Sequence, residues 1–216
     1  MITEILNIIE DYKFIEEKDL GTVIRWLLEN NPSQALPYHN FNHSLYVAYY
    51  TYTAYHYERN ARPPKELIIA ALFHDFGHSG GLCTDDKNIE IAVEGFYRYY
   101  YWQRERYKLI TRSASKTVEA LIRATEYPHK ETPDLNSYIK CLRDADMMQN
   151  CNDTLLGNFV GIKHEMFRGM PYPEYTEKTL EFLRGIRYET EYGKNVGVPL
   201  LVRAIEQMER FQESMF

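Results

Sequence analysis

Hydrophobic residues recur along this chain with the period of an α-helix rather than that of a β-strand. Residues three and four positions apart lie on one face of a helix. Two apolar stripes of this kind lie near the N-terminus, at Ile5, Ile8, Ile9 and Tyr12 and at Val23, Ile24, Leu27 and Leu28. No alternating pattern exceeds four residues, and there is no internal repeat or low-complexity tract. The pattern therefore predicts an all-α protein.

Prolines, glycines and polar clusters divide the chain into about nine helices. We expect one helix over residues 42–58 and another that begins at Pro64 and runs to His74. The other helices are expected at about residues 87–102, 113–126, 135–149, 154–168, 174–188 and 199–215. No segment has the composition of a linker, so residues 1–216 are predicted to form a single-domain helical bundle. Its motif-bearing core spans about 36–150, and helices from 151–216 pack on that core.

The composition is that of an ordinary soluble globular protein. The 216 residues allow one domain with a substantial core, and 44% of them are hydrophobic and 26% charged. The net charge of −6 argues against general binding of nucleic acids. It is compatible with a small phosphate ligand, because a bound metal ion can neutralise the phosphate locally.

The sequence also predicts a cytoplasmic protein without a membrane partner. The N-terminus lacks the basic start and long apolar core of a signal peptide. The apolar run at 67–73 is far too short to span a bilayer. Cys83, Cys141 and Cys151 are odd in number and lack metal-ligand spacing, which favours reduced thiols.

Nineteen tyrosines are unusual for this length, and many fall within residues 46–52 and 96–102. They could form an aromatic platform for a base or a partner surface. We favour a simpler interpretation, in which the rings pack on the amphipathic faces of helices and the hydroxyls reach the surface.

The most informative stretch is His74-Asp75-Phe76-Gly77-His78, at the polar end of the apolar run 67–73. Burying an imidazole and a carboxylate without partners costs on the order of several kcal/mol. A divalent metal ion is the commonest partner for such groups. His74 and His78 lie one helical turn apart on a shared face, and Asp75 is rotated from them by about a quarter turn.

Two other helix ends carry residues of the same chemistry. His43 follows the cluster Tyr38-His39-Asn40, and Asp146 closes the segment 143–146. Divalent ions that activate water take imidazole nitrogens and carboxylate oxygens and keep open positions for water and substrate. We therefore expect His43, His74, Asp75 and one of the two acidic residues of segment 143–146, Asp144 or Asp146, to hold one ion, and Asp75 could bridge to a second. The pattern does not distinguish Mn, Mg, Fe, Co and Zn.

In this order the residues resemble the HD superfamily of metal-dependent phosphohydrolases. The Tyr-His-Asn-x-x-His opening at 38–43 and the His-Asp-x-x-His at 74–78 look most like those of cyclic-nucleotide phosphodiesterases and small bacterial or phage HD hydrolases. Residues 88–92 resemble the Asn-x-Glu-x-Ala of those enzymes. The likeness covers roughly residues 36–150. Ala145-Asp146 matches the Ala-Asp pair of the family, which favours Asp146 over Asp144 as the ligand.

The resemblance implies a hydrolase that acts on a nucleotide, with a cyclic mono- or oligonucleotide phosphodiester as the first choice. His39 would be the general acid that protonates the leaving oxygen. His78 would orient the attacking water or bind a second metal. Asp75 would both bind the metal and take part in catalysis. Further residues that could orient a ligand or contact substrate are Asn40, Glu90, His129, Arg143 and Asp144.

These further residues have specific expected roles. Glu90 would hold His39 or a metal-bound water, or else be a solvated helix charge. His129 would bind a second metal or a phosphate, and Arg143 has the best position among the cations that could grip a phosphate. Asp144 would support a ligand or lie on the helix surface. His164, in contrast, is assigned to a solvated face.

Three alternatives remain open. The base-clamping glutamine motif of the phosphodiesterases is not found near the C-terminus, which leaves a nucleoside mono- or triphosphate substrate open. Some HD proteins are di-iron oxygenases, and His78 and His129 would supply the additional ligands. The third alternative is a non-catalytic nucleotide-binding module. A homodimer is compatible with all of them, and no Ser-His-Asp or Cys-His arrangement competes with water as the nucleophile.

Overall fold

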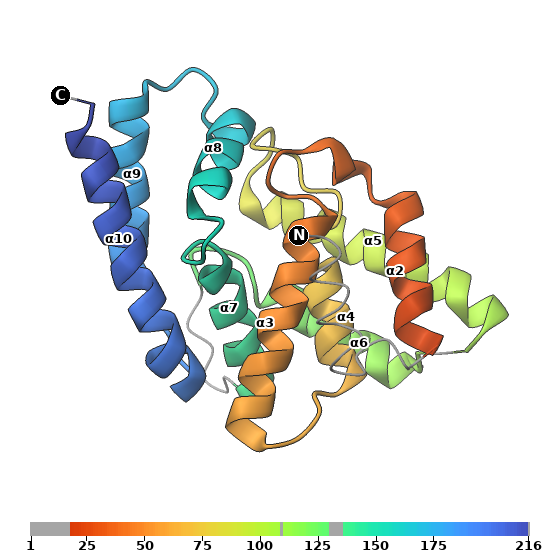
Figure 1. The fold of residues 1–216 in the computed structure, drawn as a ribbon. Helices are drawn as coiled ribbons and strands as arrows, with labels where there is room; N and C mark the ends of the chain where they lie inside the picture. Colours follow the sequence, from red (N-terminus) through yellow and green to blue (C-terminus); the bar gives the residue numbers. More distant parts are fainter. Residues whose placement is uncertain (1–17, 109, 130–135, 216) are drawn as a thin grey trace.

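A computed structural model describes residues 18–108, 110–129 and 136–215 (Figure 1). Every regular element in these ranges is helical, as the sequence predicts. The α-helices are α2 (Lys18–Asn30), α3 (Phe41–Arg59), α4 (Lys65–Phe73), α5 (Asp85–Arg106), α6 (Arg112–Arg123), α7 (Ser137–Gln149), α8 (Leu155–Met166), α9 (Tyr172–Gly185) and α10 (Val198–Glu213). A 3-10 turn, η1 (Pro32–Ala35), follows α2, and a π-helical turn, η2 (Gly193–Gly197), precedes α10. The stripe expected at Ile5–Tyr12 lies outside the described residues.

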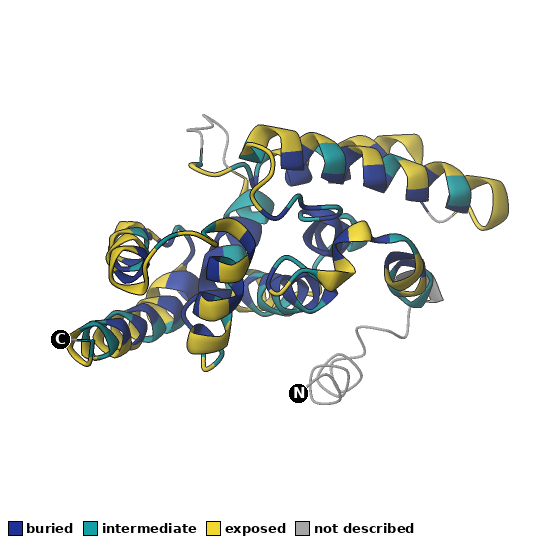
Figure 2. Cartoon of the chain, turned by 90° about the horizontal axis from the view of Figure 1, so that it is seen from above, coloured by how far each residue is buried: buried dark blue, intermediate teal, exposed yellow. Residues whose placement is uncertain are grey.

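Helix α4 is the centre of the bundle. Every residue from Leu67 to Phe73 is buried, and α4 contacts α2, α3, α5, α6 and α7. A helix that is apolar on all sides is stable only when other elements surround it. The burial colouring in Figure 2 shows the contrast with the outer helices, which are exposed along one side. The centrality of α4 places the His74-Asp75 pair inside the protein.

Helix α2 covers the turn that follows α4. Trp26 and Leu27 are buried, and the Trp26 ring stacks on Phe76 with centroids 5.6 Å apart. The stripe expected on this helix is correct for Val23 and Leu27 but wrong for Leu28, which is 54% exposed. The helix is rotated so that the large Trp26 ring faces the core, because that ring buries more apolar surface than Leu28 could.

The helices after residue 150 share a second apolar cluster with α3 and α7. Ala54 of α3 and Met148 of α7 pack in it with Phe159 of α8, Leu183 of α9 and Met208 of α10. Both α3 and α7 also contribute to the first cluster around α4. Packing of this kind agrees with the expected placement of the C-terminal helices, while the extent of a single domain stays a prediction.

The tyrosine-rich segments alternate between core and surface. Tyr99 and Tyr100 of α5 are buried against the first cluster, whereas Tyr101 is 58% exposed. Each faces a different direction because successive residues of a helix are about 100° apart. No helix within the described residues is both long enough and apolar enough to cross a bilayer.

The three cysteines are free thiols in different surroundings, which gives a testable expectation. Burial raises the pKa of Cys141 to about 12 and that of Cys151 to about 11. Since the thiolate is the reactive form, both should resist alkylation, while the exposed Cys83 reacts. Mass spectrometry after a short maleimide treatment should find one adduct in native protein and three in denatured protein. Rapid double labelling of native protein would contradict this arrangement.

Candidate metal centre

Four side chains from three helices meet at one point inside the bundle. His43 lies on α3, His74 and Asp75 follow the end of α4, and Asp146 lies on α7. The Nε2 atom of His43 is 2.9 Å from Asp75 Oδ2 and 3.4 Å from Asp146 Oδ1. The Nε2 atom of His74 is 3.2 Å and 3.7 Å from the same two oxygens. The sequence prediction that these four residues share a site therefore agrees with the geometry.

The opposite ring nitrogens fix the direction in which both imidazoles offer their lone pairs. His74 Nδ1 lies 2.8 Å from the carbonyl oxygen of Ala71, and His43 Nδ1 contacts Gln149 Oε1. A carbonyl oxygen only accepts, so Nδ1 carries the hydrogen and Nε2 points to the centre. The two Nε2 atoms are 3.0 Å apart. Two such nitrogens face each other favourably only when protons or a metal ion lie between them and the carboxylates.

The two imidazoles and the two carboxylates stabilise one another in their charged forms. Burial alone would lower the pKa of His43, but hydrogen bonds with Asp146 and Asp75 raise it to about 9. Burial also opposes protonation of His74, yet the charge of Asp75 and a hydrogen bond with Asp146 raise its pKa well above the usual range. The nearby imidazoles overcome the effect of burial on the pKa values of Asp75 and Asp146 and lower both.

This donor set fits a divalent metal ion. Two imidazole nitrogens and two carboxylate oxygens are ligands that Zn, Fe, Mn and Co accept in proteins. A doubly charged ion can replace the two protons that otherwise neutralise the carboxylates. His43, His74 and Asp146 each offer one ligand atom within 4.8 Å of the others. These buried groups could therefore hold a metal ion, and Asp75 Oδ2 lies among them.

Local sequence explains why the side chains lie at helix ends. Asn40 caps α3, because its Oδ1 accepts from the backbone N–H of Asn42 at 2.8 Å and its Nδ2 donates to the Leu36 carbonyl at 2.8 Å. After α4 the chain turns at Gly77, whose φ is +70°. A Cβ there would come within 2.7 Å of Ile91, so glycine is required. Asn40 thus orients the start of α3, the helix that carries His43.

A second buried cluster lies beside the first and consists of His39, His78 and Glu165. The rings of His39 and His78 stack with centroids 3.6 Å apart. Glu165 Oε1 is 2.5 Å from His39 Nδ1 and 3.6 Å from His78 Nδ1. Glu165 Oε2 accepts from the backbone N–H groups of Tyr38 at 2.8 Å and His39 at 3.1 Å. These three groups could also hold a metal ion.

The hydrogen bond between Glu165 and His39 affects the pKa values of both side chains. Burial raises the pKa of a carboxyl group, but hydrogen bonds with His39 and His78 lower that of Glu165 well below its usual range. Burial lowers the pKa of His39, and the hydrogen bond with Glu165 opposes that effect. His78 is held on both ring nitrogens, because its Nε2 also lies 3.0 Å from Asn88 Nδ2.

Of the two roles expected for Glu90, the structure agrees with a solvated helix charge and not with a contact to His39. Glu90 is exposed on α5, and its carboxylate pairs with Arg123 Nη1 at 2.6 Å. Asn88 and Ile89 occupy the inward face of α5, and Glu90 follows them around the helix to the outside. Glu165 takes the expected place beside His39. Its signal in the sequence is a carboxylate on the same helical face as Leu155 and Ile162.

Asp144 and Arg143 are buried away from the four-residue centre. Asp144 accepts hydrogen bonds from the backbone N–H of Glu189 at 3.0 Å and of Thr190 at 2.8 Å, and from the Thr190 hydroxyl at 2.7 Å. Asp144 therefore holds the turn before η2 in place and does not orient a metal ligand. Arg143 Nε donates to the Ala124 carbonyl at 2.7 Å. The guanidinium is thus tied to the α6–α7 side and does not line the cavity.

The two other histidines with expected assignments lie apart from both clusters. His129 belongs to neither group of potential metal ligands within the described ranges, and its Nε2 is buried without a hydrogen-bond partner. Burial, followed by the charge of Arg143, lowers the pKa of His129. His164 is exposed, as expected for a solvated face.

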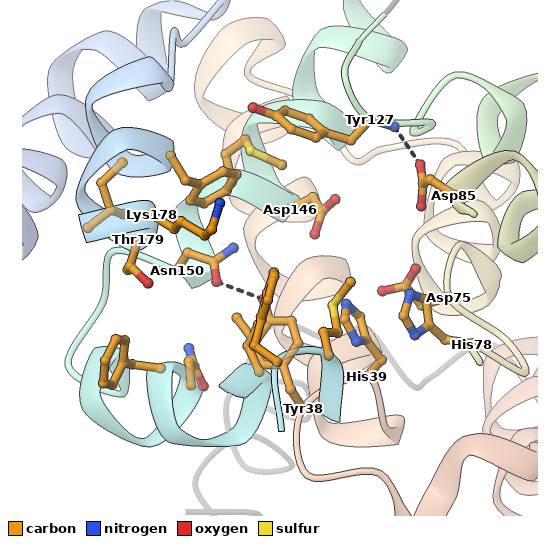
Figure 3. A pocket seen from close by; sticks show the side chains of 18 of the residues that line it. Tyr38, His39, Asp75, His78, Asp85, Tyr127, Asp146, Asn150, Lys178 and Thr179 are labelled. Atoms are coloured by element: carbon orange, nitrogen blue, oxygen red, sulfur yellow. Dashed lines mark hydrogen bonds between the residues drawn. The ribbon is translucent and has the colours of Figure 1, made fainter. Parts of the chain in front are cut away.

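A cavity of about 420 Å³ opens beside the two clusters. Figure 3 shows Asp75 and His78 on one side of it, with Lys178 and Thr179 on the other. Asp146 and His39 also line this space, and the walls away from them are aromatic and aliphatic. A pocket that combines a few converging polar groups with apolar walls is typical of small-molecule sites. Comparisons with protein-family models and with curated protein sequences find no match for this chain.

Proposed function

We propose that the protein is a metal-dependent phosphohydrolase of the HD superfamily and that its substrate is a nucleotide. A cyclic mono- or oligonucleotide phosphodiester is the first choice. One observation carries the proposal: the side chains of His43, His74, Asp75 and Asp146 converge at the end of a cavity of suitable size. The order of these residues along the chain, His … His-Asp … Asp, supports the same assignment.

The residues divide the chemistry between two adjacent clusters. His43, His74, Asp75 and Asp146 would hold the ion, which when bound supplies Lewis acidity towards water and a phosphoryl oxygen. His39 lines the cavity, and Glu165 occupies its Nδ1. The Nε2–H of a protonated His39 is therefore the proton available to the leaving oxygen. As the P–O bond breaks, that proton moves to the departing oxygen, and the ionised Glu165 stabilises the imidazolium beforehand.

The apolar walls suit the base of a nucleotide. Phe159 and Tyr175 lie with ring centroids 4.6 Å apart on the α8–α9 side of the cavity. Phe182 lines the same side and contacts Tyr127. Flat aromatic faces of this kind bind nucleobases by stacking without fixing the identity of the base.

A substrate screen tests the proposal. Purified protein should be assayed with nucleotides and cyclic nucleotides in Mn²⁺, Mg²⁺, Co²⁺ and Fe²⁺, with elemental analysis of the same sample. We expect phosphate-ester hydrolysis that a chelator abolishes, and no hydrolysis by Asp75→Ala. Oxygen uptake with bound iron and no phosphate release would contradict the proposal in favour of an oxygenase. Stoichiometric nucleotide binding without turnover in any metal would favour a binding module.

A further inference from the structure

One face of α9 forms the wall of the cavity opposite the metal centre. Its residues are spaced three and four positions apart, so they share a face, and they are Tyr175, Lys178, Thr179, Phe182 and Leu183. Tyr175 and Leu183 are buried. A helical face turned towards the interior is normally apolar throughout. Lys178 is the charged exception on this face, and its side chain is exposed, so it lies where the cavity opens to solvent.

Lys178 has no carboxylate partner among the described residues. The other lysine on this side, Lys163 of α8, is engaged, since its Nζ lies 4.6 Å from the ring of Tyr172. Lys178 is also the only lysine or arginine that lines the cavity within the described parts of the chain. Its side chain extends from α9 towards Asn150 in Figure 3. The ammonium group is therefore available to a ligand in the cavity.

Negatively and positively charged side chains lie on opposite sides of the cavity. Asp75, Asp85 and Asp146 lie on the side of the metal centre, and Lys178 lies across the cavity from Asp75. The side-chain oxygen of Asn150 accepts from the Tyr38 hydroxyl at 3.0 Å. Its amide nitrogen has no hydrogen-bond partner among the described residues and can donate beside Lys178. An anionic group bound there would meet an ammonium and an amide donor and would lie apart from the three carboxylates.

We propose that Lys178 binds a second phosphate, so that the site prefers nucleotides with a phosphate group in addition to the one that is cleaved. Cyclic dinucleotides are the simplest ligands of this class. One phosphate would lie at the metal centre and the other at Lys178, with a base against the aromatic wall between them. This inference rests on the proposed phosphohydrolase function and specifies its substrate class.

The test compares two substrates that share a base and differ in the number of phosphates. Hydrolysis of a cyclic dinucleotide and of the 3′,5′-cyclic mononucleotide should be measured, in adenine and guanine forms, with Mn²⁺. Lys178→Ala should raise KM for the dinucleotide about tenfold and change kcat little, because it removes binding at a group that does not react. KM for the mononucleotide should change less than twofold. Lys178→Arg should retain most of the preference.

The control is Lys116→Ala, which removes the same charge from an exposed position of α6 that does not line the cavity. It should leave both KM values unchanged. Added salt should reduce the preference of the wild type, since Lys178 is exposed and its charge is screened. If the wild type hydrolyses these substrates but Lys178→Ala alters both equally or neither, the inference is overturned while the proposed function stands. If the wild type hydrolyses no nucleotide, the proposed function fails and the inference falls with it.

Discussion

Replacing Asp146 by asparagine is expected to remove the metal ion and to lower kcat about 10³-fold or more. Asp146 Oδ1 faces the Nε2 atoms of both His43 and His74. An amide at this position has no negative charge and weakens every electrostatic interaction at the centre. Because Asn has nearly the same shape as Asp, the fold should survive.

Asp144→Asn is the matched control, two residues away on α7. Asp144 accepts from two backbone N–H groups and a hydroxyl, so an amide there would turn a donor towards other donors. It should lower the free energy of unfolding by about 2–3 kcal/mol and leave metal content unchanged. Elemental analysis and urea unfolding of both variants separate the two effects. Loss of metal in Asp144→Asn with retention in Asp146→Asn would reverse our ligand assignment.

The same geometry makes metal binding dependent on pH. Without metal, the carboxylates raise the pKa of His43 to about 9, so its Nε2 is protonated at neutral pH. A metal ion must displace that proton and the one on His74, so affinity should fall as pH decreases. Titration calorimetry in buffers of different ionisation enthalpy would measure the protons released. Affinity that is constant between mildly alkaline and mildly acidic pH would argue against imidazole ligands.

The helical fold and the burial of the His74-Asp75 pair can be predicted from local patterns, whereas the choice of Asp146 as a partner of that pair rests on the resemblance to the HD superfamily. Residues 67–73 are apolar at every position, which identifies a buried helix whatever its neighbours are. His74 and Asp75 end that helix, so their burial follows from the same segment. Helix boundaries are less well predicted, since α6 ends at Arg123 and not near Glu126. There the Thr125 hydroxyl donates to the Ile122 carbonyl, and Pro128 disfavours further helix.

Contacts between distant segments are harder to predict because they depend on the rotation of whole helices. Glu90 and Asn88 are two residues apart, and only the packing of α5 decides that Asn88 meets His78 while Glu90 faces solvent. The contact between Glu165 and His39 joins residues 126 positions apart in the sequence. A buried carboxylate on an apolar face can be noticed in a sequence, but its partner cannot be identified there.

The contact between Glu165 and His39 supports the second prediction with a large effect. Glu165→Gln should lower kcat about 10²- to 10³-fold, because it removes the charge that favours protonated His39. It should leave the ion at the four-residue centre in place. Glutamine keeps the size of the side chain and can still accept from the N–H groups of Tyr38 and His39. The pKa of His39, already lowered by burial, should fall further without the carboxylate. If protonated His39 is the acid, activity decreases as pH rises through this pKa, so the decline should begin at lower pH in Glu165→Gln.

A substrate that needs no acid separates this role from a structural one. In bis(p-nitrophenyl) phosphate the leaving group departs as a stable anion, so protonation by His39 contributes little. Glu165→Gln and His39→Ala should then hydrolyse this ester at nearly the wild-type rate while they remain slow on a cyclic nucleotide. Equal losses on both substrates, with an unmoved pH profile, would mean that Glu165 only holds the backbone of Tyr38 and His39 in place. Preserved activity on the ester, together with a shifted profile on the nucleotide, requires that the charge of Glu165 act through the imidazole of His39.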